Sequence, residues 1–295
     1  MRRVFVAALA AWPFVPLAAQ QAAADSGLPL ERIEQELGWQ RGDIVIAGGR
    51  ALLRVPESFR YLPPDDAERV LVAWGNPPGF ATLGMLFPAA PGPFAAGGWG
   101  VVITYEGDGH VKDDDAAKLN YDELLREMQK ASVQENRERA AAGFEPVHLV
   151  GWAEPPRYDR SSHKLYWAKE LRFGDNPAHT LNYNIRVLGK DGVLVLNAVA
   201  EMAELDAVRA AMQEVLGFVD FTAGNRYTDF VEGKDKVAAY GIAALVAGAV
   251  ASKAGFFKVL LAGLLAAKKV LAVGAVVLVA GLRKWWSRRR QVPTA

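Results

Sequence analysis

The last 59 residues of the chain, 237–295, contain no Asp or Glu but nine Lys or Arg, and Ala, Val, Leu and Gly fill most positions between them. The first 24 residues also lack acidic side chains, so all 33 carboxylates fall within residues 25–236. That central part carries 23 Lys or Arg and therefore a net charge of about −10, against +11 for the two ends together. This separation of charge predicts an acidic globular domain between two ends that interact with a membrane or its export machinery.

Residues 1–24 have the pattern of a secretory signal peptide. Two arginines form a charged start, a broken apolar stretch follows, and the small residues 22–24 suit a cleavage site. The alternative is an uncleaved N-terminal helix, which Pro13 and Pro16 disfavour because each removes a backbone donor. The pattern predicts that the acidic part is exported from the cytoplasm.

Residues 237–282 are apolar apart from four lysines, and one membrane crossing needs about 20 residues, so their length permits one or two crossings. A second crossing at 259–282 would place a lysine pair near the middle of the bilayer and return the terminal arginines to the exported side. The sequence therefore predicts one transmembrane helix at 237–257, followed by a Lys/Arg-rich amphipathic cytoplasmic segment at 258–295. The alternative is a pair of tilted membrane helices.

Small residues recur within the predicted span. Gly241, Gly248 and Gly255 are spaced seven residues apart, and small residues on one ridge let two membrane helices approach closely. This spacing predicts a homo-oligomer formed within the bilayer. The alternative is that the spacing is incidental in an Ala-rich helix.

Residues 25–223 are predicted to form one exported α+β domain, with an antiparallel sheet flanked by helices. Its last third is similar in pattern to the Mog1/PsbP type of sandwich, and residues 224–236 are predicted to tether the domain to the membrane. The expected elements, in chain order, are a helix at 28–37, a hairpin at 43–47 and 51–55, a helix at 64–74, strands at 82–87 and 99–105, a helix at 121–142, strands at 147–153, 163–173, 180–188 and 193–200, a helix at 204–216 and a strand at 218–221.

Apolar side chains in strands 163–173 and 180–188 alternate with polar ones such as Lys164, Asn184 and Arg186. The alternation predicts one buried face and one solvent face in each strand. Residues 193–199 are apolar on both faces apart from Asn197, which predicts a strand in the centre of the sheet.

The composition excludes several classes of site. The chain has no Cys, which excludes disulfides, thiolate metal sites and cysteine nucleophiles. The four histidines, His110, His148, His163 and His179, show no paired metal-ligand spacing, so they are interpreted as surface or strand-end residues, and no metal or cofactor is predicted. The acidic central part also lacks the basic surface that nucleic-acid binding requires.

Four carboxylates fall within residues 108–115, and calcium uses such oxygen ligands. Their spacing does not match the calcium-binding loop of EF-hands, so they are interpreted as negative charge ahead of a helix. The sequence also lacks the nucleophile turns and the phosphate-binding loops of common enzymes, and no catalytic residue is assigned. Carboxylates that meet only in the folded chain leave a periplasmic hydrolase open as an alternative function.

Five residues beside Pro pairs or glycines, at the predicted ends of elements, are the candidate contact residues. They are Trp74, Asn76, Trp99, Trp152 and Tyr158. Trp and Tyr combine a large apolar face with a polar group, which suits a ligand or partner-binding surface. The alternative is that these side chains close the rim of the core.

Eight stretches of the chain form one recognisable pattern: 59–62, 74–79, 83–88, 99–116, 149–171, 181–189, 193–200 and 236–248. Together they resemble a bacterial family of uncharacterised membrane-anchored proteins, domain of unknown function 2167. The resemblance implies a bacterial envelope protein with an exported domain, and it implies no activity. The prediction is therefore an inner-membrane protein with a periplasmic domain and a cytoplasmic C-terminus. Its domain is predicted to be a non-enzymatic interaction module, with the lipid bilayer and an envelope protein as partners.

Overall fold

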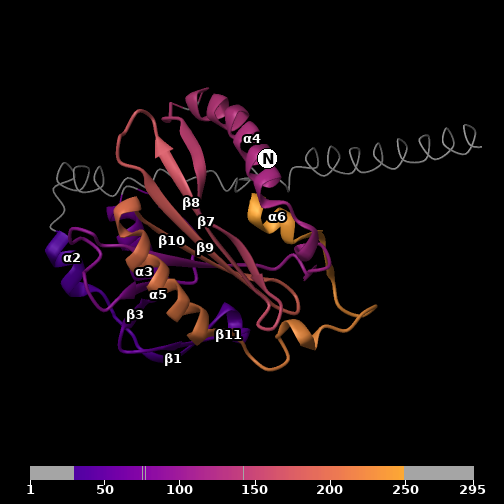
Figure 1. The fold of residues 1–295 in the computed structure, drawn as a ribbon. Coiled ribbons are helices and arrows are strands. Elements are labelled where there is room, and N and C mark those ends of the chain that lie inside the picture. Colours follow the sequence, from indigo (N-terminus) through magenta and orange to yellow (C-terminus); the bar gives the residue numbers. More distant parts are fainter. Residues whose placement is uncertain (1–29, 75, 77, 142, 249–295) are drawn as a thin grey trace, which may run out of the picture. The chain divides into compact units, whose positions relative to one another are not determined.

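The computed structural model describes residues 30–74, 76, 78–141 and 143–248. Its centre is a seven-stranded antiparallel sheet with the strand order β3-β4-β5-β10-β9-β8-β7 (Figure 1). The predicted α+β class, with an antiparallel sheet and flanking helices, is confirmed. In that order the strands are β3 (Phe59–Leu62), β4 (Met85–Pro88), β5 (Gly100–Glu106), β10 (Val193–Glu201), β9 (Thr180–Leu188), β8 (Lys164–Phe173) and β7 (Val147–Asp159).

One face of the sheet packs against helix α5 (Leu205–Phe218) and a small second sheet. The second sheet has the order β1-β2-β11 and consists of β1 (Gly42–Ile46), β2 (Ala51–Val55) and β11 (Val219–Phe221). Val208, Met212 and Val215 of α5 are fully buried, because positions 208, 212 and 215 fall on one helix stripe. Burial of each such side chain contributes about 1.5–3 kcal/mol. This face holds the largest apolar core.

The other face is covered in two parts. Helix α3 (Pro64–Ala73), with α2 (Leu30–Glu36) beside it, packs over β3, β4 and β5. Helix α4 (Tyr121–Ala141) packs along the edge strand β7 and buries only Leu124. Side-chain amides hold α4 in place, since Asn136 exchanges two hydrogen bonds with the backbone of Val147, at 3.0 and 2.8 Å.

Residues 237–247, which the sequence predicts to begin the transmembrane helix, form a strand and a short helix in the structure. Val237–Gly241 forms strand β12, which pairs in parallel with β6 (His110–Lys112). Ile242–Ala247 forms the short helix α6 (Figure 1). The domain therefore continues to at least residue 247. The apolar pattern of residues 237–247 reflects burial in the domain, since Ile242 and Val246 are each 0% exposed.

Asp115 fixes the start of α6. Its carboxylate accepts hydrogen bonds from the backbone N–H of Ile242 at 3.1 Å and of Ala243 at 3.2 Å. Gly241 leaves room for this carboxylate, because a Cβ there would lie 2.8 Å from it. Gly241 therefore ends a strand and Gly248, with φ 77°, follows a helix, so these two glycines do not share the predicted membrane-helix ridge.

Several predictions lie outside the described residues. They are the signal peptide at 1–24, residues 249–257 of the predicted transmembrane helix, Gly255, the amphipathic segment at 258–295 and the alternative second crossing at 259–282. Within the part of the chain that the structure describes, no helix has the length and apolar character that a membrane crossing requires.

The predicted solvent faces of β8 and β9 are also wrong, because both faces of the sheet are covered. Lys164, Asn184 and Arg186 are 8%, 4% and 3% exposed. Lys164 lies on the α5 side, where its Nζ donates to the carbonyls of Leu216 and Val219 at 2.6 and 2.9 Å. The predicted central position of residues 193–199 is confirmed, since β10 lies between β5 and β9.

Candidate functional site

Three of the five predicted contact residues are buried. Trp74, at 8% exposed, packs edge-to-face on Phe87, and its Nε1 donates to the carbonyl of Pro93 at 3.0 Å. Asn76 is 4% exposed, and its Nδ2 donates to the carbonyl of Leu71 at 2.9 Å. Trp99 is 4% exposed and belongs to the core on the opposite face of the sheet. Trp74 and Asn76 therefore lie together, whereas Trp99 lies apart from them.

Trp152 and Tyr158 lie within β7 rather than beyond its end, because the edge position of this strand accommodates Pro155 and Pro156. Trp152 is half-buried beneath α4, and its Nε1 donates to the carbonyl of Tyr121 at 3.2 Å. The five residues thus do not form one continuous surface. Only Tyr158 belongs to the cluster described next.

Aromatic rings from distant segments stack at the end of the sheet where β7 turns into β8. The ring centroids of His163 and Tyr227 lie 4.1 Å apart, those of Tyr227 and His110 4.2 Å apart, and those of His110 and Phe230 3.9 Å apart. Tyr158 adds a polar contact, with its Oη 3.2 Å from Nδ1 of His163. We call these five residues the histidine–tyrosine stack.

Several elements bring the stack together. His110 begins β6, Tyr158 lies near the end of β7, and His163 lies in the β7–β8 turn with a positive φ of 53°. Tyr227 and Phe230 come from the segment at 224–236, which the sequence predicts to be a tether. The sequence interpretation of the histidines as surface or strand-end residues did not predict this arrangement. His110 and His163 lie 53 positions apart, and their common contact with Tyr227 needs the tertiary fold.

Burial sets the electrostatics of the stack. It lowers the pKa of His110 and of His163, and Asp113 partly opposes both shifts. Nδ1 of His110 is buried and has no hydrogen-bond partner among the described residues. Burial and the nearby Asp113 raise the pKa of Tyr158, whose Oη donates to the carboxylate of Asp113 at 2.9 Å. At neutral pH the histidines are therefore neutral and the tyrosines keep their protons.

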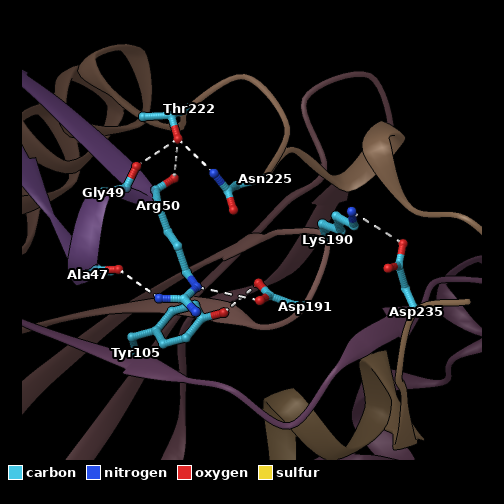
Figure 2. A network of polar contacts seen from close by, with 9 residues as sticks. All are labelled: Ala47, Gly49, Arg50, Tyr105, Lys190, Asp191, Thr222, Asn225 and Asp235. Atoms are coloured by element: carbon cyan, nitrogen blue, oxygen red, sulfur yellow. Dashed lines mark hydrogen bonds and ion pairs between the residues drawn. The ribbon is translucent and has the colours of Figure 1, made fainter.

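A second polar network adjoins the stack at the tip of the β9–β10 hairpin. Asp191 at this tip accepts a hydrogen bond from Tyr105 Oη at 2.7 Å and from Arg50 Nε at 3.4 Å (Figure 2). Lys190 forms an ion pair with Asp235 at 3.4 Å. Figure 2 also shows Thr222, whose hydroxyl donates to the carbonyls of Gly49 and Arg50 at 2.8 and 3.1 Å.

The histidine–tyrosine stack and the polar network around Asp191 both fix the C-terminal segment of the domain. Together with the β6–β12 pairing, they hold residues 222–241 against the hairpin tip, so the end of the domain is fixed rather than free. No group of three or more metal-ligating His, Asp or Glu side chains converges within the described residues. The arrangement is suited to holding the C-terminal segment in place.

A family model covers most of the chain. The model described as "Protein of unknown function (DUF2167)" matches residues 39–280. The chain belongs to the DUF2167 family. The match includes residues 224–247, so the strand β12 and the helix α6 are part of what this DUF2167 protein shares with its family.

Two solved structures match part of this DUF2167 chain, each at 10% sequence identity. A solution structure of the cyanobacterial PsbP protein CyanoP from Synechocystis covers 63% of this chain and 94% of its own, with a TM-score of 0.35. A mutant of the protein Mog1 covers 61% of this chain and 95% of its own, with a TM-score of 0.34. The comparison with curated proteins gives no match.

The histidine–tyrosine stack makes the stability of this DUF2167 domain depend on pH. Because the pKa values of His110 and His163 are lowered in the folded state, the unfolded chain binds more protons as the pH falls below about 6.5. The free energy of unfolding is therefore expected to decrease between pH 7.5 and pH 5.5, with the loss complete below the folded pKa values. Urea denaturation at the two pH values measures this change.

The matched variants are His110→Phe and His163→Phe, which keep an aromatic ring in the stack but remove the titrating group. Each is expected to reduce the difference in urea midpoint between pH 7.5 and pH 5.5. A difference as large as in the parent protein in both variants would contradict the assignment of the pH dependence to the stack.

Proposed function

We propose that this protein is held at the bacterial inner membrane, with its acidic domain in the periplasm and its C-terminus in the cytoplasm. The observation that carries the proposal is the charge separation, with about −10 in residues 25–236 and nine cations without any acid from residue 237 onward. Cytoplasmic flanks of membrane helices are enriched in Lys and Arg, which accounts for the cationic end. Because β12 and α6 belong to the domain, a single crossing would begin after residue 247.

The fixed C-terminal segment supports a module that works close to the membrane. Tyr227, Phe230 and Asp235 bind the last described segment to the hairpin tip and to His110, so little free chain separates the domain from residue 248. In this proposal the short connection keeps the domain close to the bilayer, which favours partners in the same membrane. We therefore propose a non-enzymatic interaction module whose partner is another envelope protein.

The surface around α4 and β7 supports a protein partner. Val133 of α4 and Val150 of β7 are 55% and 41% exposed. Val133 lies one turn from Gln129, whose amide donates to the carbonyl of Val150 at 3.1 Å. Exposed apolar side chains that lie together are typical of protein contact sites.

Reporter fusions test the topology. An enzyme active only in the periplasm and one active only in the cytoplasm are fused in turn after Ala295 in the full chain. The cytoplasmic reporter is expected to be active and the periplasmic one inactive. Activity of the periplasmic reporter would overturn the single crossing.

Site-specific crosslinking tests the interaction module. A photoreactive amino acid replaces Val133 or Val150 in the full chain, and Val45, 61% exposed on β1, is the matched control. Crosslinks to the same envelope protein are expected from the first two positions and not from Val45. Equal crosslinking from all three positions would count against a specific surface on α4 and β7.

A further inference from the structure

The face of the large sheet opposite α5 carries a strip of polar side chains in its middle strands. In the antiparallel register Lys169 lies opposite Asn182, Trp167 opposite Asn184, and Asn184 opposite Asn197, so these side chains share one face. Arg186 lies on the same face, two residues along β9 from Asn184. We call these residues the polar strip: Trp167, Lys169, Asn182, Asn184, Arg186 and Asn197.

The polar strip lies between the two covered parts of this face. On β5, Val102 lies opposite Asn197 and belongs to the apolar cluster beneath α3. On the other side, Glu135 of α4 acts electrostatically on Lys169. Asn182, Asn197 and Lys169 are only partly buried, so the strip is reachable from solvent at this end.

Two cations in the strip lack a close anion. Arg186 is 3% exposed. Its Nη1 donates to the carbonyl of Ile185 at 3.1 Å, and its guanidinium lies 5.0 Å from the centre of the Trp167 ring. Among the described residues no carboxylate oxygen lies within 4.0 Å of Arg186 or Lys169. Glu106 and Tyr240 face Arg186 from a greater distance. Leaving a buried charge without a paired anion costs several kcal/mol, on the order of the stability of a small domain.

Neutral donors lie beside the two cations. Nε1 of Trp167 is buried and has no hydrogen-bond partner within the described part of the chain. The three amides form a chain, in which Asn184 donates to Asn182 Oδ1 and Asn182 donates to Asn197 Oδ1, each at 2.9 Å. Because both hydrogen bonds run toward Oδ1 of Asn197, the Nδ2 group of Asn197 is the amide donor at the end of the chain.

We propose that the polar strip binds an anionic ligand through its charged oxygen atoms, those of a carboxylate or a phosphate. Arg186 and Lys169 would supply the positive charge, and Asn197 and Trp167 would donate neutral hydrogen bonds. Guanidinium, ammonium and amide donors together match the acceptor oxygens of such groups. The inference depends on neither the membrane topology nor the protein partner proposed above.

The electrostatics of Lys169 support the proposal. Burial, with Arg186 contributing, lowers the pKa of Lys169 to about 8. A bound anion would stabilise the protonated ammonium and raise this pKa, because an opposite charge nearby favours the charged form. Lys169 therefore reports directly on occupation of the strip.

The test follows the modification of Lys169 in the full chain by an amine-specific reagent at pH 8. The labelled fraction is measured by mass spectrometry, with Lys130 of α4 as an internal reference. The probes are inorganic phosphate and acetate added to the protein in neutral detergent. We expect either anion to slow labelling of Lys169 about fivefold and to leave Lys130 unchanged. Raising the pKa of Lys169 from about 8 by one unit lowers the neutral fraction of its amine at pH 8 from about one half to about one tenth.

A second arm separates a soluble anion from a lipid head group. The full chain is placed in nanodiscs of phosphatidylcholine, alone or with phosphatidylglycerol, and no other anion is added. Protection by phosphate or acetate would assign the strip to a soluble ligand, and protection only with phosphatidylglycerol would assign it to an anionic head group. Unchanged labelling of Lys169 in every arm would overturn the proposal.

The variants Arg186→Met and Asn197→Ala are expected to abolish the protection of Lys169. Arg172→Met is the matched control, because Arg172 lies on the same strand as Lys169 but on the opposite face. Circular dichroism identifies any variant that fails to fold, and Asn197→Ala keeps the test valid if Arg186→Met is such a case. Full protection in both folded variants, or in Asn197→Ala alone if Arg186→Met does not fold, would overturn the assignment to the polar strip.

Discussion

A chain of residues 25–223 is expected to be about 3–5 kcal/mol less stable than a chain of residues 25–248. The shorter chain ends at the domain boundary that the sequence predicts. It lacks Tyr227 and Phe230 of the histidine–tyrosine stack, the β6–β12 pairing, and the fully buried Ile242 and Val246. Urea denaturation followed by circular dichroism measures the difference in the free energy of unfolding.

A substitution separates specific contacts from chain length. Tyr227→Ala within residues 25–248 removes the ring between His110 and His163 and the hydrogen bond from Tyr227 Oη to the carbonyl of Val111 at 3.0 Å. It is expected to account for part of the loss, about 1–3 kcal/mol. Identical urea midpoints for the two chain lengths would show that residues 224–247 do not stabilise the domain.

Trp99→Ala is expected to destabilise the domain by about 3–5 kcal/mol, the range for removal of a buried aromatic side chain. The indole is 4% exposed and packs in the main core, so its removal leaves a cavity. Trp152→Ala is the matched comparison, because Trp152 is half-buried and is expected to cost less. The measurement is the shift in urea midpoint of each variant.

The same pair of variants bears on the predicted contact surface. Loss of a partner in the Trp99→Ala protein would follow from unfolding, whereas loss of a partner in a folded Trp152→Ala protein would indicate a contact at β7. A Trp99→Ala protein with the parent's urea midpoint would contradict the burial of this side chain.

Local patterns in the sequence predicted the regular elements well. The helix expected at 64–74 is observed as Pro64–Ala73, and the strand expected at 180–188 is observed as Thr180–Leu188. The hairpin joined by Gly48 and Gly49 is also confirmed, with Gly48 and Gly49 both at positive φ. These predictions succeeded because helix and strand periodicity act over a few neighbouring residues.

Short strands with distant partners were missed. Strand β6 has three residues and β12 has five, and they pair although more than 100 positions separate them. An apolar run such as 237–247 has no local signal that distinguishes a buried strand and helix from the start of a membrane helix. Only its packing against the rest of the domain distinguishes the two.

The sequence by itself determined the α+β class, the central position of β10 and the acidic charge of the domain, because each follows from composition or short-range pattern. Only the tertiary structure decided that Arg186 is buried, that His110 and His163 stack on Tyr227, and that residues 237–247 belong to the domain. The physical reason is that burial and pairing depend on what covers a side chain. In this protein the covering groups come from segments far away in the chain.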